Sequence, residues 1–482
     1  MATDNKGITV RKMDNFSEWY TQVIQKADLA DYSSVSGCII FKPSSYAMWE
    51  KIKDVVDAKL KASGVQNAYF PLFIPEKLLQ KEAAHLEGFS PEVAWVTIAG
   101  NTPLDERLAV RPTSETIMYE SYAKWIRSYH DLPLRLNQWN NVVRWEFKHP
   151  VPFLRSREFL WNEGHTCFAT KKEAEAEIKE IIAIYDDVCK NILALPTLIG
   201  RKSAGEKFAG ADYTISLELL MPNGRAIQGP DAHHDGQNFA KAFDITFTDQ
   251  KGKKQYVWQN TWAITTRMIG VLLAIHGDDK GAVLPPFLAP LQVVIVPILF
   301  EKNKKEILKH VTAVKEQLHQ KGVTVYVDDR EQYSPGWKFN EWEVKGIPIR
   351  IEIGPKDVEK NQAMIVRRDT AEKQPVAMDS VGKEVRFLMD MMQQSMYKNA
   401  QELLEKNIVR VETLADAEKQ LGKGKLIFAP WCESAGCETK FKEKTGAKSL
   451  NSPLEQPSIK KGQICFACKE KATVWFYFGK SY

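Results

Sequence analysis

The stretch VVRWEFKHPVPFLRSREFLWNEGH, residues 142–165, combines fixed cations with aromatic rings and carboxylates. Arg144, Arg155 and Arg157 supply cations, two prolines lie between the first two, and the aromatic residue Trp161 follows the third. A guanidinium donates two hydrogen bonds at once to a phosphate, and a flat ring stacks on a base. The mixture is therefore more typical of a nucleoside triphosphate site than of a purely structural segment.

The spacing within this stretch adds to the indication. Arg144 and Glu146 form an Arg-x-Glu pair at the end of an expected strand, VVRWEF. Eight residues separate Glu146 from Arg155, and Phe159 follows four positions later. Arginines on a surface hairpin are often only solvated, so this pattern alone leaves a structural interpretation open.

The overall composition restricts the class of protein. The 482 residues are 44% hydrophobic and 26% charged, with a net charge of only +5, which suits a globular chain of roughly two to four domains. We expect no DNA partner, because a basic surface would have to be local. The run 281–300 contains four prolines and predicts a linker and a buried strand rather than a membrane span.

Periodicity outlines the N-terminal half. Residues 46–62 show the apolar stripe of a helix that Gly64 ends, and residues 67–75 predict a strand with a proline at an edge or interface. A second amphipathic helix is expected over 171–193, and a strand followed by an apolar helix over 255–275.

The pattern changes after the prolines. Strands and helices alternate over about 291–395, which indicates a separate α/β domain, and a third unit from roughly 396 to 482 holds four clustered cysteines. The seven cysteines do not form the framework of a secreted disulfide protein, so we expect a reducing cytoplasm.

Five strings together are specific. They resemble prolyl-tRNA synthetases, class II enzymes, most closely the archaeal and eukaryotic form, and the likeness covers nearly the whole chain. The strings are RPTSETIMYESYAKW (111–125), DLPLRLNQWNNVVRWEFKHP (131–150), FLWNEGH (159–165), GRKSAGEKFAGADYT (200–214) and WAITTRMIG (262–270).

The resemblance implies a fold and a reaction. It implies an α+β catalytic domain with an antiparallel sheet at 1–285, an α/β anticodon-binding domain at 286–395 and a small C-terminal zinc-binding α/β domain at 396–482. The implied reaction activates L-proline with ATP and Mg²⁺ to prolyl-adenylate, releases pyrophosphate, and transfers proline to the 3′-terminal ribose of tRNA(Pro). Pro71 matches an interface proline, which implies a homodimer.

The resemblance also implies the site residues. Arg144 would hold the α-phosphate, Arg155 the outer phosphates and Arg267 the γ-phosphate, while Phe159 would stack on adenine. The implied ATP-binding set is Arg144, Glu146, Arg155, Phe159, Gln228, Thr265 and Arg267. The implied proline-binding set is Thr113 and Glu115 for the amine, with Arg144, Phe89, Trp161, Glu163, His165 and His233 around the ring.

Two further features qualify the resemblance. The family usually has glycine, threonine and serine where this chain has Pro230, Asp231 and Ala232, so a ligand role for these three is not expected. About ninety residues separate the string FLWNEGH from the string WAITTRMIG, which leaves no room for a large editing insertion. We therefore predict low-level activation of alanine and cysteine, because a missing methylene changes binding by only ~1–3 kcal/mol.

The two remaining domains carry their own candidates. For anticodon binding, the resemblance of residues 334–354 suggests Lys338, Glu343 and Arg350. Cys432-x4-Cys437 and Cys465-x2-Cys468 are separated by twenty-seven residues, which is the arrangement of a closed, structural Zn²⁺ site.

Three interpretations of the chain remain open at the level of sequence. The first is an active prolyl-tRNA synthetase, and the second is a paralogue that binds tRNA or ATP without charging. The third is a class II enzyme for another amino acid. The presence of Arg144, Arg155 and Arg267 together favours activity, and RPTSET with FLWNEGH argues against a different amino acid.

Overall fold

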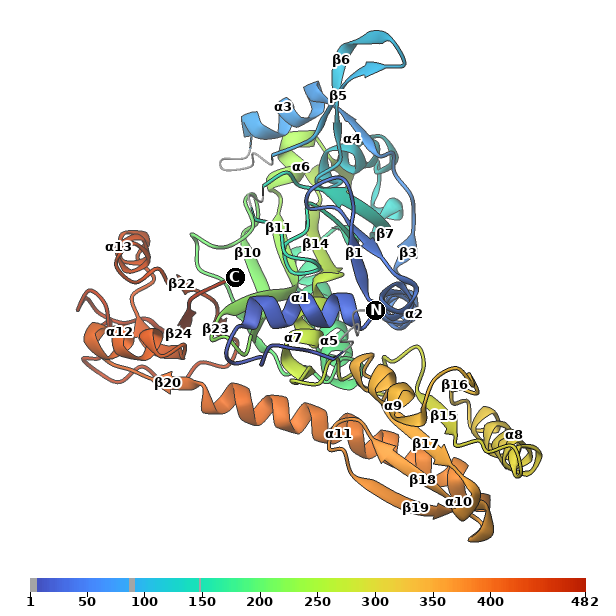
Figure 1. Ribbon diagram of the computed structural model, residues 1–482. Coiled ribbons are helices and arrows are strands. Elements are labelled where there is room, and N and C mark those ends of the chain that lie inside the picture. Colours follow the sequence, from blue (N-terminus) through green and yellow to red (C-terminus); the bar gives the residue numbers. More distant parts are fainter. Residues whose placement is uncertain (1–6, 86–91, 147–148) are drawn as a thin grey trace.

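The computed structural model describes residues 7–85, 92–146 and 149–482, which form three parts, each built around its own sheet (Figure 1). The largest part has an eight-stranded sheet and lies at the centre, a five-stranded α/β part follows, and a small four-stranded part ends the chain. This arrangement confirms the expected fold class of an antiparallel α+β domain followed by two α/β domains.

The central sheet has the strand order β23-β9-β10-β11-β14-β8-β7-β3. Its neighbouring strands are antiparallel, except that β3 runs parallel to β7. The strands are β3 (Gln66–Asn67), β7 (Leu134–Val143), β8 (Glu158–Phe168), β9 (Leu198–Arg201), β10 (Tyr213–Leu220), β11 (Ala226–Gly236), β14 (Trp258–Thr265) and β23 (Ser452–Pro453).

Helices cover both faces of this sheet. One apolar core joins it to α1 (Phe16–Lys26), α2 (Pro43–Ala62), α5 (Lys171–Asn191) and α7 (Arg267–His276). A second core joins it to α4 (Glu115–Trp125) and α6 (Asn238–Phe243). The remaining elements are β1 (Ala30–Tyr32), β2 (Ile39–Phe41), β4 (Phe73–Pro75), α3 (Glu76–His85), β5 (Trp95–Ala99), β6 (Thr102–Val110), β12 (Thr246–Thr248) and β13 (Lys254–Tyr256).

The helices expected from periodicity at 46–62 and 171–193 are confirmed as α2 and α5, and Gly64 follows α2 with a positive φ of 90°. The single strand expected over 67–75 is wrong. This segment forms β3 in the central sheet and β4 in a separate three-stranded sheet with β5 and β6. Pro71 lies in the connection, where its missing N–H cannot continue a ladder.

The second part contains three parallel and two antiparallel strands in the order β16-β15-β17-β18-β19. The proline-rich run 281–300 ends in the buried strand β15, as predicted. The elements are β15 (Val293–Pro297), α8 (Lys304–Gln320), β16 (Val325–Val327), α9 (Pro335–Val344), β17 (Ile349–Ile353), α10 (Pro355–Glu359), β18 (Gln362–Arg367), β19 (Lys373–Ala377) and α11 (Val381–Lys406). Across the three ranges of the chain given above, no helix is both long and apolar enough to cross a bilayer.

The third part has the sheet order β20-β21-β24-β22. The 26-residue helix α11 leads into it, so the expected boundary at 395–396 falls inside one continuous helix. The elements are β20 (Ile408–Arg410), α12 (Leu414–Gly422), β21 (Leu426–Trp431), α13 (Ala435–Thr445), β22 (Lys448–Ser449) and β24 (Val474–Gly479). Its strand β23 joins the central sheet, and Tyr482 donates from its backbone N–H to the carbonyl of Ala226 at 2.9 Å.

Candidate active site

Alternating residues of three neighbouring strands form the floor of a cavity of about 290 Å³ in the central domain. Trp161, Glu163 and His165 of β8 lie opposite Thr265, Ala263 and Thr261 of β14. Asp231 and His233 of β11 lie opposite the last two of these. Since alternate side chains of a strand point to one face, the register brings these polar groups together.

Most residues expected at the site line this one cavity. Arg155 instead lines a second cavity of about 180 Å³, which shares Gln228 and Arg267 with the first. Phe89 lies outside the described residues. The expected residues that line the first cavity are Thr113, Glu115, Arg144, Glu146, Phe159, Trp161, Glu163, His165, Gln228, His233, Thr265 and Arg267.

Thr113 and Glu115 form a buried acceptor pair at one end of the cavity. Their exposures are 7% and 4%, and the Thr113 hydroxyl donates to the Glu115 carboxylate. Within residues 7–85, 92–146 and 149–482, no lysine, arginine or histidine forms an ion pair with this carboxylate. A buried carboxylate is normally paired, so this end of the cavity suits an ammonium group.

Glu163 is saturated with donors beneath this pair. It accepts hydrogen bonds from the Ser114 backbone (3.0 Å), the amide of Asn140 (2.7 Å) and His165 (3.1 Å). Burial opposes its charge, but the hydrogen bond and charge of His165, with the bonds from Ser114 and Asn140, lower the pKa of Glu163 to about 2. Burial opposes the charge of His165 as well, yet the same contact with Glu163 raises the pKa of the imidazole. The result is a rigid, buried ion pair.

Two arginines of the same cavity supply cations, and Arg144 donates to the carbonyl oxygen of Pro112, the residue before Thr113, at 3.0 Å. The guanidinium of Arg144 lies 5.5 Å from the ring centre of Phe159 and 5.2 Å from that of Trp161. Arg267 donates to the carbonyl oxygens of Leu154 (3.2 Å) and Gln228 (3.1 Å). Burial and the charge of Arg144 lower the pKa of Arg267. Cations that repel one another at a cavity wall are stabilised by an anion placed among them.

Asp231 adds a carboxylate to this cavity. Its carboxylate accepts a hydrogen bond of 2.5 Å from the Gln228 amide and is 3.6 Å from Nε2 of His233. His233 also contacts the Thr214 hydroxyl at 2.8 Å and stacks on Phe208 at 4.6 Å. Burial lowers the pKa of His233, so the ring is neutral near pH 7. Asp231 lines the cavity although it departs from the family pattern.

Several lining residues were missed at the level of sequence. Phe208 and Lys202 belong to the string GRKSAGEKFAGADYT, which carries the resemblance as a whole but contributes no residue to the implied binding sets. Ser114 lies between two selected residues and holds Glu163 through both its backbone and its hydroxyl. One feature of the sequence does point to Lys202. It is a charged residue directly after β9, a strand that begins with apolar residues, and a charge at the end of such a strand is a candidate for a binding site.

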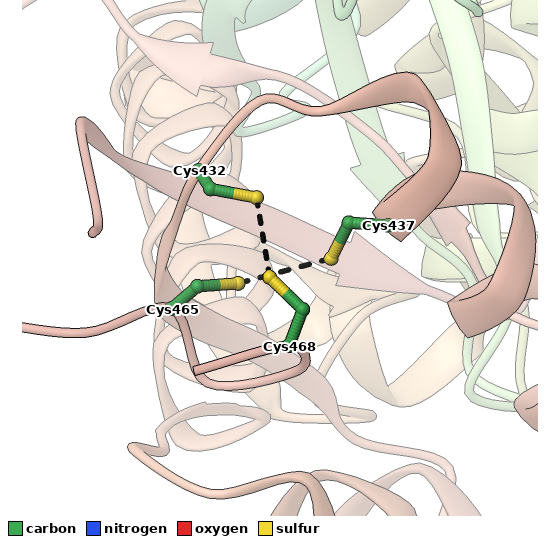
Figure 2. Close-up of side chains that lie close together, drawn as sticks. All are labelled: Cys432, Cys437, Cys465 and Cys468. Atoms are coloured by element: carbon green, nitrogen blue, oxygen red, sulfur yellow. Dashed lines mark hydrogen bonds between the residues drawn. The ribbon is translucent and has the colours of Figure 1, made fainter. Parts of the chain in front are cut away.

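The four clustered cysteines meet at the start of α13 and in a turn near β24 (Figure 2). Their sulfur atoms lie within 4.8 Å of one another, with distances of 3.5 Å for Cys432–Cys468 and 3.8 Å for Cys437–Cys465. Sulfurs bound at about 2.3 Å around a tetrahedral zinc ion are roughly 3.8 Å apart. The spacing fits Zn²⁺ and far exceeds the ~2.05 Å of a disulfide.

The three anticodon candidates lie in different settings. The Lys338 side chain is buried, and its ammonium donates to the carbonyl of Asp328 at 3.0 Å. Glu343 pairs with Lys280 at 2.9 Å, and Arg350 pairs with Glu352 at 3.0 Å. The ammonium of Lys338 is therefore engaged inside its domain, whereas the other two are partly exposed.

Comparisons with known proteins agree along the whole chain. Family models match for the tRNA synthetase class II core domain (G, H, P, S and T) at 95–276, the anticodon binding domain at 292–388 and the prolyl-tRNA synthetase C-terminal domain at 414–482. The cytoplasmic proline–tRNA ligase of Arabidopsis thaliana is 48% identical over 99% of this chain and 91% of its own length.

Solved structures give the same result. The crystal structure of Cryptosporidium parvum prolyl-tRNA synthetase with halofuginone and AMPPNP has a TM-score of 0.96 at 46% identity, covering 99% of this chain and 100% of that one. The same enzyme complexed with L-proline and AMP has a TM-score of 0.95 at 44% identity, covering 99% and 98%. The chain therefore belongs to the prolyl-tRNA synthetases, the class II ligases that join proline to tRNA.

Proposed function

We propose that the cavity binds ATP and L-proline side by side and forms prolyl-adenylate. The observation that carries the assignment is the buried Glu115 carboxylate, which forms no ion pair of its own with a lysine, arginine or histidine among the described residues and lines the same cavity as Arg144 and Arg267. A zwitterionic amino acid with a reactive carboxylate satisfies both kinds of charge at once. Glu115 and Thr113 accept the two N–H donors of the secondary ammonium, and Arg144 receives the carboxylate end.

The wall of the cavity holds the proline ring. Trp161 supplies an aromatic face, and the ion pair of Glu163 with His165 fixes the floor beneath it. His233, held neutral by burial, completes the wall with Phe208 behind it. Phe89 is proposed for the same wall from its sequence position alone. A ring without polar atoms is well matched by aromatic surfaces.

The arginines and the aromatic Phe159 hold the nucleotide. We assign the α-phosphate to Arg144, the outer phosphates to Arg155 and the γ-phosphate to Arg267, with Phe159 stacked on adenine. Gln228, Thr265 and Glu146 complete this end. Mg²⁺ is a hard ion that prefers oxygen ligands, which Glu146 and Asp231 offer in the same cavity, and it would neutralise phosphate charge.

The chemistry requires positioning more than proton transfer. A carboxylate oxygen of proline attacks the α-phosphorus, the bond to the bridging oxygen breaks, and pyrophosphate leaves with that electron pair. The arginines stabilise the charge on the phosphoryl oxygens. A hydroxyl of the terminal tRNA ribose then attacks the acyl carbon, so that AMP leaves and proline is joined to the tRNA.

We expect Glu115→Gln to lower proline-dependent ATP–pyrophosphate exchange at least 100-fold, because it removes the charge that pairs with the ammonium. Glu120→Gln is the matched control, since Glu120 lies on the same helix but on its exposed side, 3.5 Å from Lys124. Exchange by the control should stay within about twofold. Near-normal exchange by Glu115→Gln would refute the assignment of the amine subsite.

We also propose that Cys432, Cys437, Cys465 and Cys468 hold one structural Zn²⁺ per chain. Metal analysis of the purified protein should give one zinc, and Cys468→Ser should lose it and lower the melting temperature. Cys38→Ser, which lies outside the cluster, should keep both. Full zinc content in Cys468→Ser would disprove the ligand set.

A homodimer and a cytoplasmic location complete the proposal. Exposed apolar side chains on both sides of Pro71, such as Tyr69 at 71% and Phe73 at 45%, support an interface there. None of the seven cysteines, all of which lie among the described residues, forms a disulfide, which suits a reducing compartment. For tRNA binding, we propose Glu343 and Arg350 as anticodon contacts and Lys338 as the residue that positions α9, the helix that carries Glu343. Sedimentation of the purified chain at a mass of one subunit would exclude the dimer.

A further inference from the structure

A third cavity, of about 510 Å³, lies between the edge of the catalytic sheet and the C-terminal domain. Arg201, Lys207 and Tyr213 line it from the catalytic side. Leu454 and Glu433 line it from the C-terminal side. None of these five residues takes part in the activation step described above, so the cavity requires a separate explanation.

Lys202 connects this space with the site of activation. Its side chain lines all three cavities, and its ammonium is anchored 3.0 Å from the carboxylate of Glu218. The second cavity lies at the triphosphate end and is bounded by Tyr482. The third cavity therefore borders the activation site at Lys202, and none of the residues assigned to the nucleotide lines it.

The catalytic wall of the third cavity offers a charged stacking surface. The exposed guanidinium of Arg201 lies 4.8 Å from the ring centre of Tyr213. Burial raises the pKa of Tyr213 to about 12, so its hydroxyl remains neutral. Lys207 adds a third cation to those of Arg201 and Lys202, against the carboxylates of Asp212 and Glu433.

Backbone pairing makes this wall rigid. Arg201 is the last residue of β9, where it pairs with Ile215 of β10 on one side and Ser452 of β23 on the other. Tyr213 begins β10. Leu454, which is 58% exposed, follows β23 directly and gives the opposite wall an apolar side chain. Cations beside flat apolar surfaces are the features that bind single-stranded nucleic acid.

The geometry that the transfer step requires identifies the single strand that would bind in this cavity. The terminal ribose of the tRNA has to reach the acyl carbon inside the first cavity, while the nucleotides before it remain outside. We propose that the third cavity receives the unpaired 3′ end of the tRNA, with one base against Arg201 and Tyr213 and the backbone along Lys207. This inference rests on the aminoacylation activity but is independent of the residues assigned to activation.

Arg201→Glu tests the proposal, and Arg410→Glu is the matched control. Arg410 is also exposed and lies over aromatic rings, 5.7 Å from Phe428 and 5.5 Å from Trp475, but it does not line the cavity. Exchange of pyrophosphate, which needs no tRNA, should stay within twofold in both variants. Aminoacylation kcat/KM for tRNA should fall at least tenfold in Arg201→Glu and less than twofold in Arg410→Glu.

A shortened tRNA locates the contact. The affinity of wild-type protein and Arg201→Glu is measured for intact tRNA(Pro) and for the same tRNA without its unpaired 3′ nucleotides. We expect the variant to lose affinity only for the intact tRNA. Equal losses for both tRNAs, or normal aminoacylation by Arg201→Glu, would overturn the proposal. If the wild-type protein shows no proline-dependent pyrophosphate exchange, the proposed activation function is rejected instead.

Discussion

Asp235 carries a buried carboxyl group whose two oxygens have no well-formed hydrogen bond from the described residues. Burial, together with the charge of Glu115, raises its pKa well above the ordinary value. The folded protein then holds a proton that the unfolded chain has already released. The free energy of unfolding therefore decreases as the pH rises from the usual aspartate range through the raised pKa.

Asp235→Asn should remove this dependence. We expect the melting temperature of the variant, relative to wild type, to increase between pH 5 and pH 8. Asp131→Asn should show no such change over this range, because hydrogen bonds from the backbone of Arg127 and Ser128 lower the pKa of Asp131, and its carboxyl group is then ionised in both the folded and the unfolded chain above pH 5. A difference in melting temperature between Asp235→Asn and wild type that stays constant with pH would contradict the expectation.

At the scale of elements, the two-residue strand β23 docks the C-terminal domain onto β9. Gly200 permits this approach, because a Cβ at its position would lie 2.3 Å from the carbonyl oxygen of Ser452. Gly200→Ala should separate the strands, which would speed hydrogen exchange near Ser452 and slow aminoacylation. Gly336→Ala is the control, since a Cβ there meets no atom within 4 Å and should not lower stability. Unchanged hydrogen exchange near Ser452 would show that the two strands accommodate the added methyl group without separating.

Elements with a strong period were predictable, and their connections were not. The apolar stripes of α2 and α5 follow from helical geometry. The arginines and aromatic residues around Arg144 predict the position of the site in the sequence. The sequence 67–75 has the composition of one strand, yet it divides between two sheets because Pro71 interrupts the ladder. Asp235 and Lys202 depend on contacts between distant strands, which no local pattern contains.

At the scale of the molecule, the ion pair of Arg368 with Asp278 joins the second domain to the first, beside the more exposed pair of Lys280 with Glu343. Arg368 contacts Asp278 with both terminal nitrogens at 2.7 Å, and its side chain is 4% exposed. Arg368→Met should raise the KM for tRNA at least threefold without changing pyrophosphate exchange, because the reaction site and the anticodon domain lose their fixed orientation. Arg386→Met, which removes an exposed arginine 3.8 Å from Asp390, should change neither value. A normal KM in Arg368→Met would show that other contacts suffice.

The strand pairing of β23 also bears on how the enzyme is made. The central sheet is ordered β23-β9-β10, so its edge is supplied by residues synthesised some 250 positions after β9. Ser481 also bridges to Ala226. A chain still attached to the ribosome at residue 440 has every proposed activation residue but lacks this edge. Completion of the central sheet is thereby delayed until translation of the C-terminal domain is nearly finished, and prematurely terminated chains lack its edge strand.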